Sequence, residues 1–191
     1  FFLKIGGIMS YKDDDIRTIE TIGLHNLLSF GPDTESISLK AYDMFHNAVI
    51  SAEDGEYPIL LVDSEDPITS GPWDHLKVLD CWDRPVGTED DQAQMMTTCM
   101  ETWIMADHEA LRKVFGSCLM ERALIPTDNL EERSRQELLQ ALKSATRDCG
   151  KRKGYDKGKR SFQILAELNT RSLEENLHYF RRLKKTLGRH L

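Results

Sequence analysis

The sequence contains no long apolar run and no cysteine pair at metal-binding spacing. None of its 191 residues lies in a stretch of the ~18 consecutive apolar residues that a membrane-spanning helix needs, which predicts a soluble, cytoplasmic protein. The four cysteines are Cys81, Cys99, Cys118 and Cys149. Because no Cys-x-x-Cys occurs and no histidine stands at zinc-finger spacing, a zinc module is not expected. We expect reduced thiols that mostly fill the core, since disulfides are rare in the cytosol.

Several catalytic and low-complexity patterns are also absent. There is no nucleophile elbow, no Ser-His-Asp order and no Gly-x-x-x-x-Gly-Lys phosphate loop, which gives no support to an α/β-hydrolase or a P-loop ATPase. No internal repeat is visible, and 40% hydrophobic with 30% charged residues is typical of a folded globular chain.

The charge is unevenly distributed along the chain. The net charge is −7, with acidic residues dominating from Asp13 to Asp107 and basic residues dominating from Lys151 to Lys185. An acidic site beside a basic surface is what a metal-dependent enzyme acting on a polyanion needs. The alternative is that both regions are ordinary solvated faces.

Apolar runs and periodicities predict an α/β fold with a mostly parallel sheet flanked by helices and a helical C-terminal part. The expected strands are residues 1–5, 36–39, 58–62 and 94–105. The expected helices are residues 13–28, 40–53, 107–115, 131–147, 161–168 and 172–187, with Asp107 as an N-cap. Residues 1–125 are predicted to form the α/β core, and residues 126–191 a helical C-terminal extension packed on it.

Acidic residues follow the clearest strand. Asp63 comes directly after the run Pro58–Val62, and Glu65 lies two positions later. Ligands of open α/β sheets bind at the carboxyl ends of strands, and carboxylate oxygens are the ligands that Mg²⁺ prefers. A turn that caps the next helix is the alternative. Glu101 lies inside an apolar stretch and needs a partner or a metal there, unless it faces outward from a half-exposed strand.

Further candidates are polar side chains that could contact nucleic acid or phosphate. His75 follows the acidic turn, although a single histidine is more often a packing residue. Tyr155 stands among Lys153, Lys157 and Lys159, a composition that suits phosphate contact. The alternative for this segment is a solvated, exposed loop.

Several sequence blocks carry a resemblance to a known family. They are Leu60–Pro67, Pro72–Leu76, Trp82–Pro85, Gln94–Asp107, Leu142–Arg147 and Gly154–Gly158. As a set they resemble a bacterial family, the domain-of-unknown-function 4276 family (DUF4276).

That resemblance implies a Toprim-like domain whose acidic residues hold Mg²⁺ (or Mn²⁺) for cleavage of nucleic acid. Asp63 and Glu65 would match the metal motif, with Glu101 as a third catalytic candidate. It also implies a partner ATPase of the SMC or overcoming-lysogenization-defect (OLD) type, of the AAA or ABC class, in an anti-phage defence locus. The expected substrate is DNA or RNA. No membrane association is expected, and a homo-oligomer is possible.

The chain departs from the family pattern at its start. Members of the family that the chain resembles usually begin with a strand ending Val-Glu-Gly-Gly-Gly-Asp. In this chain Ile5 stands at the position of that Glu and Met9 at the position of that Asp. Without the Glu, general acid/base assistance worth ~10²–10⁴-fold would be missing. The leading hypothesis is a Mg²⁺-dependent nuclease-type effector. The second is a catalytically degenerate module that binds its ATPase or nucleic acid, and the third a phosphatase with Asp63 as nucleophile.

Overall fold

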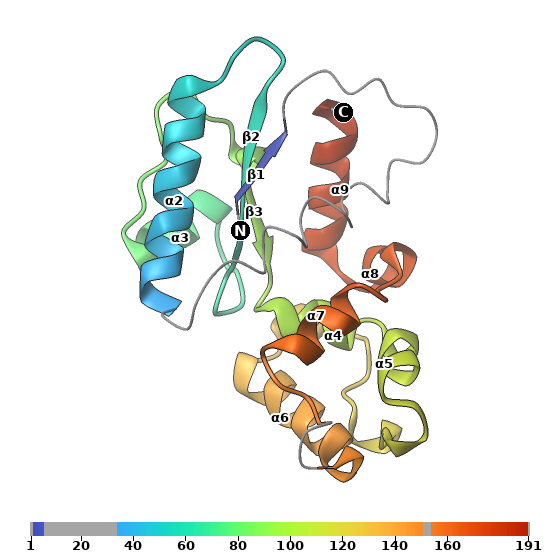
Figure 1. Cartoon of the computed structure of the whole chain (residues 1–191). Coiled ribbons are helices and arrows are strands. Elements are labelled where there is room, and N and C mark those ends of the chain that lie inside the picture. Colours follow the sequence, from blue (N-terminus) through green and yellow to red (C-terminus); the bar gives the residue numbers. More distant parts are fainter. Residues whose placement is uncertain (1, 6–33, 151–153, 191) are drawn as a thin grey trace. The chain divides into compact units, whose positions relative to one another are not determined.

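The computed structural model describes the backbone of residues 2–5, 34–150 and 154–190, and the side chains of residues 41–150, 154–158 and 160–190. It has a mixed α/β fold (Figure 1). The strands are β1 (Phe2–Ile5), β2 (Tyr57–Asp63) and β3 (Ala93–Met96). The helices are α2 (Thr34–Ser51), α3 (Pro72–Asp80), α4 (Met100–Met105), α5 (His108–Phe115), α6 (Arg135–Thr146), α7 (Lys159–Leu165), α8 (Thr170–Asn176) and α9 (His178–His190). Short 3₁₀ helices are η1 (Asp90–Gln92), η2 (Gly116–Cys118), η3 (Glu121–Ala123), η4 (Leu130–Glu132) and η5 (Arg147–Cys149). The helix predicted over residues 13–28, and Met9, lie outside the described residues.

The sheet is mixed rather than mostly parallel. Its strand order is β1-β2-β3, with β2 and β3 parallel and β1 antiparallel to β2. Ile5 pairs with Tyr57, the first residue of β2, and Phe2 pairs with Leu60. The end of β1 therefore lies at the start of β2, six residues before Asp63. The strand predicted over Pro58–Val62 is confirmed, and Ile59 and Leu60 in it are fully buried.

The described chain divides into two compact units. Their limits differ from residue 125, after which the sequence predicts a helical extension, and that domain boundary stays a prediction. The first unit holds the strands up to Val62 and Met95, with α2, α3 and residues 182–190. In Figure 1, α2 and α3 lie on one side of this sheet and the end of α9 on the other. The Phe45 ring packs 5.7 Å from that of Trp73, and Arg182 donates a 2.6 Å hydrogen bond to the Ala93 carbonyl.

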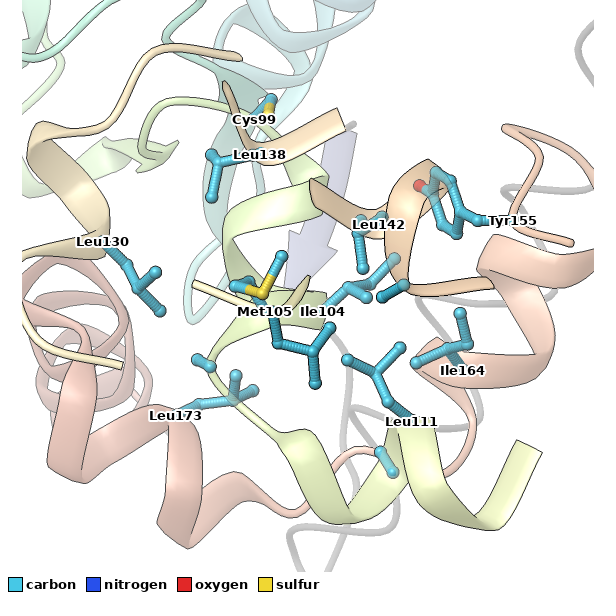
Figure 2. Close-up of a cluster of buried hydrophobic side chains, with 14 of the residues drawn as sticks. Cys99, Ile104, Met105, Leu111, Leu130, Leu138, Leu142, Tyr155, Ile164 and Leu173 are labelled. Carbon is cyan, nitrogen blue, oxygen red and sulfur yellow. The ribbon is translucent and has the colours of Figure 1, made fainter. Parts of the chain in front are cut away.

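The second unit, residues 63–67 and 96–181, has a helical core. Helix α4 packs against α5, α6 and α7 at its centre. Figure 2 shows apolar side chains converging there, among them Ile104 of α4, Leu111 of α5 and Leu142 of α6. The fully buried ones include Ile104, Met105, Leu111, Leu130, Leu138, Leu142 and Ile164. Burying a side chain of this kind contributes about 1.5–3 kcal/mol, so this cluster is a main source of the unit's stability.

One predicted strand is wrong, and another is too long. Residues 36–39 belong to α2, because the helix predicted to begin at residue 40 already begins at Thr34. The predicted strand 94–105 ends at Met96 and is followed by α4. Within α4, Glu101, Thr102, Ile104 and Met105 are buried, which is one face of a helix rather than an alternating strand pattern.

The helix boundaries in the C-terminal half agree with the sequence in part. Asp107 caps α5 as predicted, with its carboxylate accepting from the backbone of Glu109 and Ala110. The single helix predicted over residues 172–187 is wrong, because α8 and α9 are separate. The Glu131 carboxylate explains the break: it accepts the backbone N–H groups of His178 and Tyr179 and so caps the start of α9.

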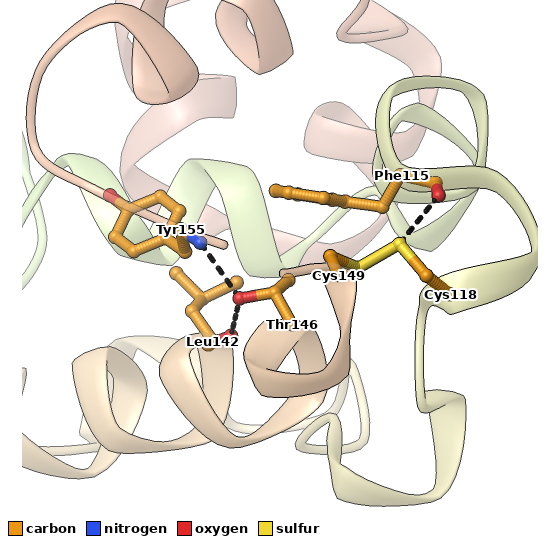
Figure 3. Close-up of a disulfide and its surroundings, with 6 residues drawn as sticks. All are labelled: Phe115, Cys118, Leu142, Thr146, Cys149 and Tyr155. Carbon is orange, nitrogen blue, oxygen red and sulfur yellow. Dashed lines mark hydrogen bonds between the residues drawn. A yellow bond between two sulfur atoms is a disulfide. The ribbon is translucent and has the colours of Figure 1, made fainter. Parts of the chain in front are cut away.

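The expectation of four reduced thiols is also wrong. Cys118 and Cys149 form a disulfide across 31 positions of sequence (Figure 3), while Cys81 and Cys99 are free. The pairing arises because η2 and η5, which follow α5 and α6, end beside each other in the second unit.

No helix in the described part of the chain is long and apolar enough to span a membrane.

Candidate functional site

Asp63 is placed by a tight turn that ends β2. The Ser64 backbone N–H donates to the Met96 carbonyl at 3.2 Å, and the Ser64 hydroxyl donates to the Asp66 carbonyl at 2.7 Å. Glu65 adopts a left-handed backbone conformation with φ 60°, which turns the chain sharply away from the strand. Asp63 itself is half-buried, and its Oδ1 atom is inaccessible to solvent.

Glu101 lies in the first turn of α4 and is completely buried. Its Oε1 atom accepts a 2.8 Å hydrogen bond from the Tyr155 hydroxyl and lies 3.3 Å from the Lys157 ammonium nitrogen. Its Oε2 atom is buried and has no hydrogen-bond partner among the described residues. Tyr155 and Lys157 therefore hold Oε1, and the Cys99 thiol lies beside the same carboxylate.

The charge of Glu101 acts on the Asp63 carboxylate. Burial, and after it the charge of Glu101, raise the pKa of Asp63 to about 6, while Lys157 and Arg135 act in the opposite direction. Asp63 Oδ1, like Glu101 Oε2, has no hydrogen-bond partner in the part of the chain that is described. Buried polar atoms are nearly always paired, and buried like charges are costly.

An unpaired carboxylate oxygen of this kind is a ligand that a divalent cation would accept. Hard cations such as Mg²⁺ take oxygen ligands, typically one or two carboxylates completed by water and substrate phosphate. The donor set and its two unpaired buried oxygens therefore fit such an ion.

Two neighbours of these carboxylates, Tyr155 and Cys99, are neutral. Burial and the Glu101 charge raise the pKa of the Tyr155 hydroxyl well above its usual value, so this hydroxyl stays protonated. Burial raises the pKa of the Cys99 thiol to about 12, with Glu101 and Asp63 adding to the effect. Because the thiolate is the reactive form, Cys99 is not a nucleophile at neutral pH.

The metal pair of Asp63 and Glu65 stays a prediction. Glu65 makes an ion pair with Arg135, at the start of α6, and its side chain is 52% exposed. The charge of Glu101 acts on Asp63, and the predicted position of Glu101 on a strand is corrected to a helix. No sequence signal identified Arg135 as the partner of Glu65, because 70 positions separate them.

The predicted phosphate-contacting residues have different positions. Tyr155 is 6% exposed and donates to Glu101, so the alternative of a solvated, exposed loop is wrong at this residue. The Lys157 side chain is 40% exposed and reaches both solvent and Glu101. His75 is buried in α3 of the first unit. Lys153 and the Lys159 side chain lie outside the described residues.

A second acidic group occurs in the first unit. Glu89, Asp91 and His190 bring potential ligand atoms within 4.8 Å of one another. The Tyr57 hydroxyl donates to both acids, and Arg189 forms a 2.8 Å ion pair with Asp91. This group already has protein donors and a protein cation, in contrast to the unpaired oxygens of Asp63 and Glu101.

Comparison with known proteins gives one match. The model of a family described as Domain of unknown function (DUF4276) matches residues 19–188 of the chain. This confirms the resemblance drawn from the blocks between residues 57 and 168, and the matched range contains Asp63, Glu101, Tyr155 and Lys157. No curated protein and no solved structure gives a match.

Proposed function

This chain belongs to the DUF4276 family, and we propose that it is a Mg²⁺- or Mn²⁺-dependent nuclease-type protein with a Toprim-like site. The observation that carries the proposal is the pair of buried carboxylate oxygens, Asp63 Oδ1 and Glu101 Oε2, that lack hydrogen-bond partners in the described structure. These two side chains would hold the cation. Glu65, which is paired with Arg135, is not needed for it.

When bound, the ion would neutralise charge that develops on a phosphodiester and lower the pKa of a bound water. The chain's own residues prepare the site. Tyr155 and Lys157 hold Oε1 of Glu101, so that Oε2 is oriented away from them. The exposed part of Lys157 presents an ammonium group to a substrate phosphate, which is the contact that positions nucleic acid without reading its sequence.

Glu101 could replace the glutamate that the family pattern has at the position of Ile5. Since Ile5 pairs with Tyr57 at the start of β2, a glutamate there would stand at the opposite end of that strand from Asp63. Glu101 supplies a second carboxylate at Asp63 from a different element, α4. The substitution at Ile5 is therefore compatible with cation binding.

The biological setting of the proposal rests on the family resemblance. A cytoplasmic effector that works with an SMC- or OLD-type ATPase in anti-phage defence agrees with a chain that has no P-loop of its own. The partner would supply ATP hydrolysis, and this chain would supply phosphodiester cleavage.

The test is cleavage of plasmid DNA and total tRNA by the purified protein, with and without the neighbouring ATPase, in Mg²⁺, Mn²⁺ or EDTA. We expect metal-dependent nicking that Asp63→Asn and Glu101→Gln abolish. Glu65→Gln is the matched control, because it removes an acid from the same turn but not from the pair, and it should retain activity. Cleavage that persists in EDTA or in Glu101→Gln would contradict the proposal.

A second candidate function is a non-catalytic module that binds its ATPase or nucleic acid. It is favoured by Ile5 and Met9, which stand where the family pattern has acids. It predicts a stable complex with the ATPase that forms equally well in EDTA and in Asp63→Asn, without cleavage under any condition. A complex that requires the metal or Asp63 would exclude it.

A further inference from the structure

The disulfide lies at the base of the segment that reaches Glu101. Cys149 ends η5, and Tyr155 and Lys157 follow six and eight positions later. Cys118 ends η2, so the bond joins the end of α5 to the segment after α6. Figure 3 shows the disulfide and Tyr155 on either side of Thr146, near the C-terminal end of α6.

Thr146 connects these two features. It is fully buried, its hydroxyl donates to the Leu142 carbonyl at 2.8 Å, and it accepts the Tyr155 N–H at 2.8 Å (Figure 3). Gly154 also lies close to Thr146, because a Cβ atom at Gly154 would be 3.3 Å from the Thr146 carbonyl oxygen. Residues 154–158 therefore begin packed on the end of α6, three residues before Cys149. From there they extend Tyr155 and Lys157 to Glu101.

We propose that the Cys118–Cys149 disulfide is a redox control of the site, which holds Tyr155 and Lys157 against Glu101 when oxidised and loosens them when reduced. The effect on a bound cation rests on the proposed function of the Asp63–Glu101 pair. Residues that orient a metal-binding carboxylate typically contribute about 10–100-fold to metal affinity. We expect the lower value, about 10-fold, because reduction would weaken the hydrogen bond between the Tyr155 N–H and Thr146 without removing it.

The chemistry is a thiol–disulfide exchange with a dithiol reductant. A thiolate attacks the Cys118 sulfur, which belongs to a partly exposed residue, and a second thiol of the same reductant resolves the mixed disulfide. The S–S bond is replaced by two S–H groups, and the dithiol leaves as its own disulfide. Cys118 Sγ lies 2.9 Å from the Phe115 carbonyl oxygen, to which the new thiol can donate.

The experiment compares oxidised and dithiothreitol-reduced protein in a Cys81→Ser background, which removes the exposed free thiol. Hydrogen exchange is measured over residues 154–158, and Mn²⁺ affinity by calorimetry. Far-ultraviolet circular dichroism checks that both forms are folded. Reduction should accelerate exchange at Tyr155 and weaken Mn²⁺ binding about 10-fold. By linkage, saturating Mn²⁺ should then lower the disulfide potential by about 30 mV.

A variant that keeps the disulfide tests the same connection. Thr146→Val removes the acceptor of the Tyr155 N–H and should loosen residues 154–158 in the oxidised protein, while Thr146→Ser should not. Unchanged exchange at Tyr155 on reduction would overturn the inference, whatever the metal result. Accelerated exchange without Mn²⁺ binding in either state would support the control by the disulfide and contradict the proposed function.

Discussion

Replacing Asp63 by asparagine should stabilise the metal-free protein at neutral pH. Burial and the Glu101 charge raise the pKa of Asp63 from 3.8 to about 6 in the folded state. Each pKa unit corresponds to about 1.4 kcal/mol, so keeping this carboxylate ionised costs about 3 kcal/mol of folding free energy at pH 7. Asparagine carries no charge, and its amide could also donate to Glu101.

The pH dependence has a definite sign. Because the folded protein binds the Asp63 proton more tightly than the unfolded chain, this residue adds stability as the pH falls from about 6 to about 4. That contribution is fully present below pH 4 and is lost as the pH rises through 6. The free energy of unfolding of Asp63→Asn minus that of the wild type should therefore grow from near zero at pH 4 to about 2–3 kcal/mol at pH 7.

The assay is urea unfolding followed by circular dichroism in EDTA, from pH 4 to pH 7. The difference between the two proteins isolates Asp63 from other titrating groups. Asp66→Asn, which removes an exposed acid from the same turn, is the control for the loss of one acidic side chain there. A difference that does not change with pH, or a less stable Asp63→Asn protein at pH 7, would refute the account of Asp63 as a buried, uncompensated carboxylate.

Three further predictions concern the second unit. Cys118→Ser/Cys149→Ser should lower the free energy of unfolding in urea by about 3 kcal/mol, because the bond closes a loop across 31 positions, and equal stability of oxidised wild type and variant would contradict this. Ser134→Ala should cost about 1 kcal/mol by the same measurement, since the Ser134 hydroxyl caps α6, whereas Ser134→Asp should retain most of the stability. Ile104→Ala should cost about 2–5 kcal/mol and lower the thermal midpoint, because Ile104 is fully buried in the helical core; a smaller loss would mean that the core collapses around the cavity.

Local patterns were sufficient for β2 and for its acidic end. The run Pro58–Val62 is apolar throughout, as buried strands are, and Asp63 follows it directly. The Asp107 cap of α5 was predictable for a similar reason, since a cap acts on the residues next to it. In both cases the interaction lies within a few positions of the residue that signals it.

The partners of the acidic residues depended on tertiary structure. Glu101 contacts Tyr155, 54 positions later, and Glu65 pairs with Arg135, 70 positions later. Contacts between residues so far apart in sequence produce no periodic pattern from which they could be predicted. A glutamate in an apolar stretch does indicate that it needs a partner, but a short apolar run suits a strand and a helix equally and so does not predict the helix α4.

The disulfide was missed for a related reason. Cysteine spacing predicts a bridge only where a framework of paired cysteines is dense, and four cysteines in 191 residues do not form one. Its geometry depends on where α5 and α6 end, which is a result of how these helices pack.

Mn²⁺ binding by calorimetry to EDTA-treated protein tests the central claim, that Asp63 and Glu101 together form the cation site. Wild-type protein should bind the ion, and Asp63→Asn and Glu101→Gln should each lose this binding. Glu65→Gln should keep it, and Glu89→Gln separates any contribution from the acidic group of the first unit. Binding that survives Glu101→Gln but is lost in Glu65→Gln would contradict the account and return the site to the acidic turn alone.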